Sequence, residues 1–307
     1  MKYLPFLDGK YSTAPGLTAM AKAEHAADRL VFQLDEQYET YISNKSECRE
    51  EDIHKYYVEA DLYGETAATV NRHIVRQLVA EYPVVFAWES RHGHNTLHNI
   101  RTGESLQWAD DWIDIRHSGY LSLFDGLCSQ VQEDMAICQL DGDRDWLAAI
   151  HLSAPNHWSP AEKTGQPFGA VHGVVPGMEK LNQQYFKMLV MAVQKGPFFR
   201  FAWGLATDTR LNHHPDPRPG FDRTAWQGRS ISAEGSQFYL RVERQTINGL
   251  PTCNAFLFTI RTYFYNIDEL TATEKKALVM AVESMSPESL EYKGLKGKSD
   301  ILAKILL

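Results

Sequence analysis

Residues 236–265 read SQFYLRVERQTINGLPTCNAFLFTIRTYFY. Two parts of this segment, 236–246 and 254–265, are rich in aromatic and β-branched residues, a composition typical of strands. Because successive side chains of a strand point to opposite faces, the first part should present two different faces, with Arg241, Glu243 and Gln245 on one and Leu240, Val242 and Arg244 on the other. We therefore predict that the two strands pair as a β-hairpin.

Three further strands are predicted upstream of this hairpin. Residues 135–140 (MAICQL) and 146–155 (WLAAIHLSAP) flank the turn sequence DGDRD and indicate another hairpin. Residues 197–207 (PFFRFAWGLAT) resemble the strands already described in composition. Five strands with few crossover helices between them favour an antiparallel sheet over a doubly wound one.

Helical periodicity occurs on both sides of these strands. Residues 66–81 carry apolar side chains at helical spacing, and Pro83 ends the pattern. Three other stretches are predicted as helices, namely 21–37, 119–133 and 271–285. The fold class is therefore α+β, an antiparallel sheet flanked by helices, with helical elaborations at both ends. No linker divides the chain, so one domain over residues 1–307 is expected.

Composition excludes several classes of function. The formal net charge is −8 and no basic face is concentrated in the sequence, so a nucleic-acid partner is not expected. No apolar run is long enough for a membrane span and no signal peptide precedes the domain, so a cytoplasmic location is expected. The four cysteines are far apart in the sequence and are expected to be reduced thiols rather than ligands of an iron–sulfur cluster.

The histidines are the candidate metal ligands, because no phosphate-loop, HExxH or GxSxG motif is present. The runs at residues 92–98 and 213–214 are more typical of exposed loops, and His151 lies in a predicted strand as a core histidine. His172 is different, since small residues and two glycines surround it in AEKTGQPFGAVHGVVPG (161–177) and let a planar ligand approach the backbone. A histidine that caps a turn before Pro176 is the alternative interpretation.

Arginines and tryptophans supply a second set of candidates. Arg241, Arg244 and Arg261 lie on the two paired strands and can hold the acidic arms of a cofactor. A salt-bridge ladder with Glu243 is the alternative. Trp158 and Trp203 can stack on a ring, although core packing is the usual role of tryptophan. Residues 208–236 show no period and are expected to be either functional or disordered, with a lid over the site as one possibility.

Several stretches resemble the heme-dependent oxidative N-demethylase family, the heme subunit of enzymes that oxidise dimethylamine. They occur in family order over most of the chain, and they are YLPFLDGKY (3–11), VQEDMAICQLDG (131–142), NHWSPAEKTGQPFGAVHGVVPG (156–177), LRVERQTINGLP (240–251), FLFTIRTY (256–263) and SMSPESLEYKGL (284–295). The resemblance implies a PAS-like core at about residues 83–286 and heme b held by one histidine. It also implies a monooxygenase reaction in which a small amine and O2 give formaldehyde.

Residue by residue, the resemblance implies that His172 is the iron ligand. Trp158, Lys163, Arg241, Arg244 and Arg261 become expected cofactor contacts, and Glu243 becomes the expected catalytic residue that holds the substrate ammonium. Electrons would come from NADPH through a partner reductase with FMN and an iron–sulfur cluster. A non-catalytic heme or small-ligand sensor is the alternative function, and a family member without heme is a third possibility.

Overall fold

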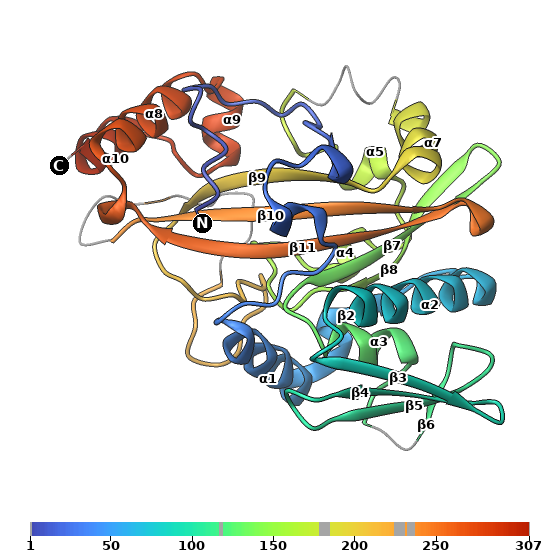
Figure 1. The fold of residues 1–307 in the computed structure, drawn as a ribbon. Coiled ribbons are helices and arrows are strands. Elements are labelled where there is room, and N and C mark those ends of the chain that lie inside the picture. Colours follow the sequence, from blue (N-terminus) through green and yellow to red (C-terminus); the bar gives the residue numbers. More distant parts are fainter. Residues whose placement is uncertain (1, 117–118, 178–184, 224–230, 232–236, 307) are drawn as a thin grey trace.

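A computed structural model describes residues 2–116, 119–177, 185–223, 231 and 237–306. In these residues the central element is a seven-stranded sheet in which all neighbours are antiparallel. Figure 1 shows the long hairpin at the middle of this sheet. The strand order is β1 (Thr18–Ala19), β9 (Phe198–Ala206), β10 (Tyr239–Leu250), β11 (Ala255–Asn266), β7 (Asp134–Asp141), β8 (Arg144–His151) and β2 (Tyr57–Glu59).

The predicted hairpins and the α+β class are confirmed. β10 pairs with β11 from Tyr239 with Asn266 to Leu250 with Ala255, and β7 pairs with β8 across a turn that contains Gly142 at a positive φ of 60°. As the predicted alternation requires, Arg241, Glu243 and Gln245 share one face of β10. The cavity described below lies on that face.

A second, four-stranded sheet was not predicted. It consists of β3 (Phe86–Arg91), β4 (His94–Asn99), β5 (Ser105–Ala109) and β6 (Ile115–Arg116). The expectation that residues 92–98 form an exposed loop is wrong, because only His92 and Gly93 turn the chain, both with positive φ, and the following residues are strand β4. The ring nitrogens of His98 form hydrogen bonds with the side chains of Ser105 and Glu89.

Three helices lie between the two sheets, as Figure 1 shows: α1 (Tyr38–Tyr56), α2 (Gly64–Glu81) and α3 (Leu123–Cys128). The helix predicted over residues 66–81 is confirmed as α2, whose apolar stripe packs in the main hydrophobic core. The helix predicted over 119–133 is limited to α3. Beyond it, the buried side chains of Gln132 and Glu133 accept hydrogen bonds from main-chain N–H groups of Asp35 and Gln33.

In the described residues, the opposite face of the large sheet carries α5 (Phe168–Val171), α7 (Tyr185–Lys195), α8 (Ala272–Glu283), α9 (Pro287–Tyr292) and α10 (Lys298–Leu306) (Figure 1). The short helix α4 (Pro160–Lys163) contacts the edge strand β2, β8 and helix α1. α8 confirms the helix predicted over 271–285. The end of α7 approaches β10 so closely that a Cβ on Gly249 would lie 2.1 Å from the main-chain oxygen of Val193, so only glycine fits there.

The helix predicted over residues 21–37 is wrong. Short 3₁₀ turns occupy Met20–Lys22 and Ala26–Arg29, and the chain then runs on without helical hydrogen bonds. The N–H groups of Val31 and Phe32 donate instead to the carboxylate of Glu81, at 2.7 and 3.0 Å. Acceptors from distant side chains thus replace the main-chain acceptors that a helix would supply.

Residues 208–236 lie partly outside the described residues. The described part, 208–223 and 231, contains no helix or strand apart from a single bridge between His213 and Asn156. The interpretation of residues 208–236 as a lid over the site therefore stays a prediction. Among the helices that the structure describes, none has both the length and the apolar character needed to cross a membrane.

Candidate functional site

A cavity of about 620 Å³ lies on the face of the large sheet that α5 and α7 cover. The sheet contributes alternate residues of β10 and β11, namely Arg241, Glu243, Gln245, Ile247, Phe256, Phe258 and Ile260. Residues 11–13 of the N-terminal segment, the stretch from Asn156 to His172, and Lys293 after α9 close the other sides. The period-2 pattern of β10 therefore selects which of its side chains reach the cavity.

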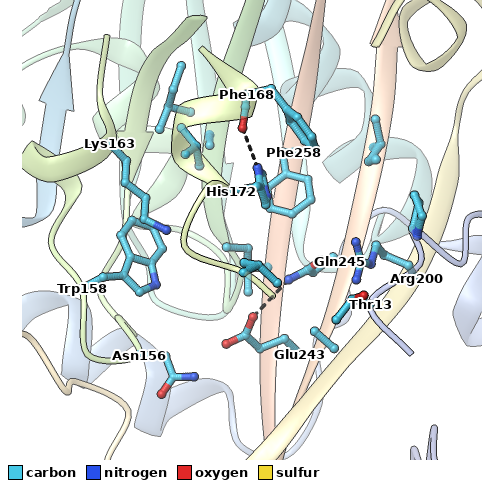
Figure 2. A pocket seen from close by; sticks show the side chains of 18 of the residues that line it. Thr13, Asn156, Trp158, Lys163, Phe168, His172, Arg200, Glu243, Gln245 and Phe258 are labelled. Carbon is cyan, nitrogen blue, oxygen red and sulfur yellow. Dashed lines mark hydrogen bonds between the residues drawn. The ribbon is translucent and has the colours of Figure 1, made fainter. Parts of the chain in front are cut away.

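His172 is the candidate ligand in this cavity. It follows the last residue of α5, and its Nδ1 lies 3.0 Å from the main-chain oxygen of Phe168 (Figure 2). A carbonyl oxygen only accepts hydrogen bonds, so Nδ1 carries the hydrogen and Nε2 carries the lone pair. Burial lowers the pKa of His172 to about 4, with smaller contributions from Lys163 and Arg200. The imidazole is therefore neutral, in the tautomer that a metal ligand requires.

The metal-ligand and turn-capping interpretations of His172 involve different ring nitrogens, so the two roles are compatible. Nδ1 caps a carbonyl at the end of α5, as the alternative interpretation expected for a turn. Nε2 makes no hydrogen bond within the residues described, and His172 lines the cavity. The ring also stacks on Phe168, with centroids 4.0 Å apart and planes 29° apart. The orientation of the imidazole is thus fixed by one neighbouring residue.

Glu243 places a carboxylate in the same cavity. Its Oε2 accepts a hydrogen bond of 3.1 Å from Nε2 of Gln245, which Figure 2 shows. Its Oε1 lies 3.6 Å from Nε of Arg241, close enough for an ion pair but too far for a hydrogen bond. The side chain of Glu243 keeps 18% of its surface exposed, so this carboxylate can meet a ligand.

Cations outnumber anions around the cavity. Lys163 lies over the ring of Trp158, 4.2 Å from its centroid, and burial lowers its pKa while Glu162 and Glu243 oppose this shift. Arg200 lies on β9 opposite Gln245, and its Nε is buried without a hydrogen-bond partner in the described part of the chain. Arg241 and Lys293 complete the set, against Asp145, Glu162 and Glu243. Such a surface suits a ligand with acidic groups.

Arg244 and Arg261 do not reach this cavity. Both lie on the other face of the hairpin, directly opposite each other in the register of β10 and β11. Nη2 of Arg244 donates to the main-chain oxygen of Leu30 at 2.7 Å, and its Nε lies 3.3 Å from the carboxylate of Asp28. Arg261 bonds the carboxylate of Asp35 at 2.9 Å. These two arginines therefore hold the N-terminal segment on the sheet.

The expectation that residues 213–214 form an exposed loop is wrong, because His214 is buried and the side chain of His213 is only 9% exposed, with its Nε2 3.0 Å from the carboxylate of Asp208. Trp158 and Trp203 both line the cavity. His151 is a core histidine whose Nε2 lies 3.1 Å from the carboxylate of Asp125, which confirms the structural interpretation of that residue. Most of the cavity lining was not predicted, including the polar residues Arg200, Gln245 and Lys293. Arg200 had a usable signal, since it is the charged residue of a strand that otherwise consists of apolar residues and glycine.

A comparison with known protein families finds one match that extends over most of the chain. The family model described as "Haem-dependent oxidative N-demethylase, alpha subunit-like" matches residues 22–302. This range contains α5, the whole large sheet except β1, and the side chains of Trp158, Lys163, His172, Arg241 and Glu243. The family suspected from the sequence motifs is thereby confirmed.

Proposed function

The chain belongs to the haem-dependent oxidative N-demethylase alpha subunit-like family, and from this premise we propose that Nε2 of His172 holds heme b for the oxidative removal of a methyl group from a small secondary or tertiary amine. One observation carries the proposal. The Nδ1 hydrogen of His172 is engaged by the Phe168 carbonyl, so the lone pair of the neutral ring is available on the side of the cavity.

The residues present fit a heme. Its macrocycle is flat and apolar, and the cavity offers aromatic surfaces on Phe168, Trp158 and Phe258. Its propionates are anions, and two cations, Lys163 and Arg200, lie close enough to His172 to lower the pKa of its ring. The unpartnered Nε of Arg200 offers a donor for a carboxylate. We assign Trp158 and Lys163 as cofactor contacts on these grounds.

When bound, heme would supply the oxidation of the N-methyl carbon by O2, after which formaldehyde and the shorter amine are released. The chain's own residues position the amine. At neutral pH the substrate is a cation, and the carboxylate of Glu243 is the acidic group that can accept its N–H hydrogens. Gln245 donates to the other oxygen of this carboxylate and so orients it.

The remaining parts of the proposal concern partners and architecture. We propose that electrons come from NADPH through a reductase subunit with FMN and an iron–sulfur cluster, in agreement with the alpha-subunit description of the family. We further propose that the enzyme is one cytoplasmic domain and that its core, at about residues 83–286, is PAS-like. The large antiparallel sheet with helices on both faces supports this core.

An absorption spectrum of the purified protein supplied with hemin tests the proposed function. A Soret band that shifts on addition of dimethylamine, together with formaldehyde production when a reductase is added, is the expected result. A Soret band that does not respond to amines would favour the heme sensor, and no band at all would favour a member without heme.

A further inference from the structure

Arg241 is a buried cation with free hydrogen-bonding capacity. Its side chain is only 4% exposed. Nη2 donates to the main-chain oxygen of Ala154 at 2.7 Å and contacts Oγ1 of Thr262 at 3.5 Å. Nε and Nη1 have no hydrogen-bond partner within the described ranges. A buried charged donor is costly to leave unpaired, so these two nitrogens favour an anionic acceptor in the adjoining cavity.

The acceptor is not supplied by Glu243. Although Oε1 of Glu243 is 3.6 Å from Nε of Arg241, this oxygen is beyond hydrogen-bond distance, and the other oxygen is bonded to Gln245. Both side chains come from the same face of β10, two residues apart. A guanidinium and a carboxylate therefore lie side by side in one cavity. Their arrangement is complementary to a ligand that carries an ammonium and a carboxylate close together.

Along β10, Arg241 lies away from the part of the sheet on which Phe168 packs. Phe168 of α5 packs in the hydrophobic cluster that contains Ile247 and Phe256. Ile247 is six residues from Arg241 along β10, which corresponds to about 20 Å of strand. Lys163 and Arg200 are the cations proposed above for the propionates, so the two unpartnered donors of Arg241 can serve another anion.

We propose that Arg241 and Glu243 form a subsite for a zwitterionic N-methylated amino acid, with its carboxylate on Nε and Nη1 of Arg241 and its ammonium on Glu243. The inference deepens the proposed function and rests on it for the chemistry that follows binding. Recognition itself depends only on residues of this chain. The substrate class is then an amine with an acidic group, such as N,N-dimethylglycine, rather than a simple alkylamine.

Calorimetric titration of the hemin-supplied protein tests this subsite. N,N-dimethylglycine and dimethylamine are compared, because both are cations at nitrogen and only the first carries a carboxylate. We expect N,N-dimethylglycine to bind about ten- to a hundredfold more tightly, the contribution of hydrogen bonds between charged groups. The ratio should fall to about one in Arg241→Met and to an intermediate value in Arg241→Lys, which keeps the charge without the bidentate geometry.

The matched control is Arg144→Met, which removes an exposed arginine paired with Asp61 on the β7–β8 hairpin. It should leave the affinity ratio unchanged. Equal affinities of the two amines in the unaltered protein would overturn the inference, and this measurement needs no variant. Loss of heme in Arg241→Met in proportion to the loss of N,N-dimethylglycine binding would also overturn it, because Arg241 would then hold a propionate.

The outcome also separates this inference from the proposed function. If the protein binds no heme but still prefers N,N-dimethylglycine through Arg241, then the subsite is correct and the heme-dependent reaction is wrong. If heme is bound and shifts with dimethylamine while N,N-dimethylglycine binds no better, then the reaction stands and the subsite is wrong.

Discussion

The imidazole of His172 both stacks on the ring of Phe168, at a centroid distance of 4.0 Å, and bonds the main-chain oxygen of that residue, at 3.0 Å. The stacking sets the plane of the ring and the hydrogen bond sets its tautomer. A single residue one turn earlier in the chain therefore fixes both properties that a metal ligand needs. This relationship connects the short helix α5 to the proposed chemistry.

Replacement of Phe168 by alanine should weaken heme binding. The main-chain hydrogen bond remains, but the ring of His172 loses the surface that holds its plane, and loss of such support typically costs about tenfold in affinity. Hemin titration followed by the Soret band measures the change. Phe221→Ala, at a half-exposed ring remote in sequence from α5, is the control and should bind heme normally. Equal affinities in both variants would contradict a supporting role for Phe168.

Glu243→Gln should weaken amine binding without loss of heme. Glutamine keeps the shape of the side chain but removes the charge that attracts an ammonium, so at least about tenfold more dimethylamine should be needed for the same spectral shift. Glu162→Gln, at an exposed carboxylate on the rim of the cavity, is the matched control. Unchanged shifts in Glu243→Gln would exclude this residue as the ammonium contact.

Arg244→Met should destabilise the fold rather than the site. The substitution leaves Asp28 without its buried cationic partner, and breaking one side of a buried ion pair typically costs about 3–5 kcal/mol. Denaturant unfolding measures the loss, and the folded fraction should bind heme with unchanged affinity. A variant that unfolds normally but loses heme would instead place Arg244 in the cofactor site.

The stability contribution of Glu81 should decrease as pH rises. Burial raises its pKa to about 7, Glu133 adds to the rise, and the N–H groups of Val31 and Phe32 oppose it. The folded state therefore holds a proton that the unfolded state has lost between the ordinary pKa of a glutamate, about 4.3, and about 7. In this window stability falls with increasing pH.

Glu81→Gln removes this titration. The free energy of unfolding of the unaltered protein, measured relative to that of the variant, should be larger at about pH 5 than at about pH 8. Glu104→Gln is the control. The carboxylate of Glu104 accepts hydrogen bonds from Gln130 and Tyr120 elsewhere in the fold, so this variant measures the effect of losing a carboxylate other than that of Glu81. A difference that is constant across the pH range would show that Glu81 is not the titrating group.

Much of the large sheet could be predicted because its strands are regular and apolar. β7 to β11 are rich in apolar, aromatic and β-branched residues, and Gly142 marks the turn between β7 and β8. The small sheet could not be predicted in this way. On β4 the buried positions are Asn95, Leu97 and Asn99, so two of the three are polar and the alternation of hydrophobicity disappears. These asparagines are satisfied by Asp110 and Gln130, partners that the sequence does not reveal.

Helix α1 could not be predicted from a pattern of apolar residues either. The buried residues of α1 are aromatic or polar, and one is Lys45, which donates to the carbonyls of Cys128 and Glu133.

The candidate site could be predicted in part. Alternation along β10 separates Arg241 from Arg244, so only Arg241 could share a pocket with Glu243. The pairing of Arg200 with Gln245 depends on strand order, which the sequence alone does not determine.

The central claim is that Nε2 of His172 ligates heme iron, and the most direct measurement is the heme content of His172→Ala after hemin is supplied. We expect less than about a tenth of the normal heme, with recovery of the Soret band when free imidazole is added to replace the missing ligand. His157→Ala, at another histidine that lines the cavity, is the matched control and should retain its heme. A His172→Ala protein with full heme content and an unchanged spectrum would contradict the account.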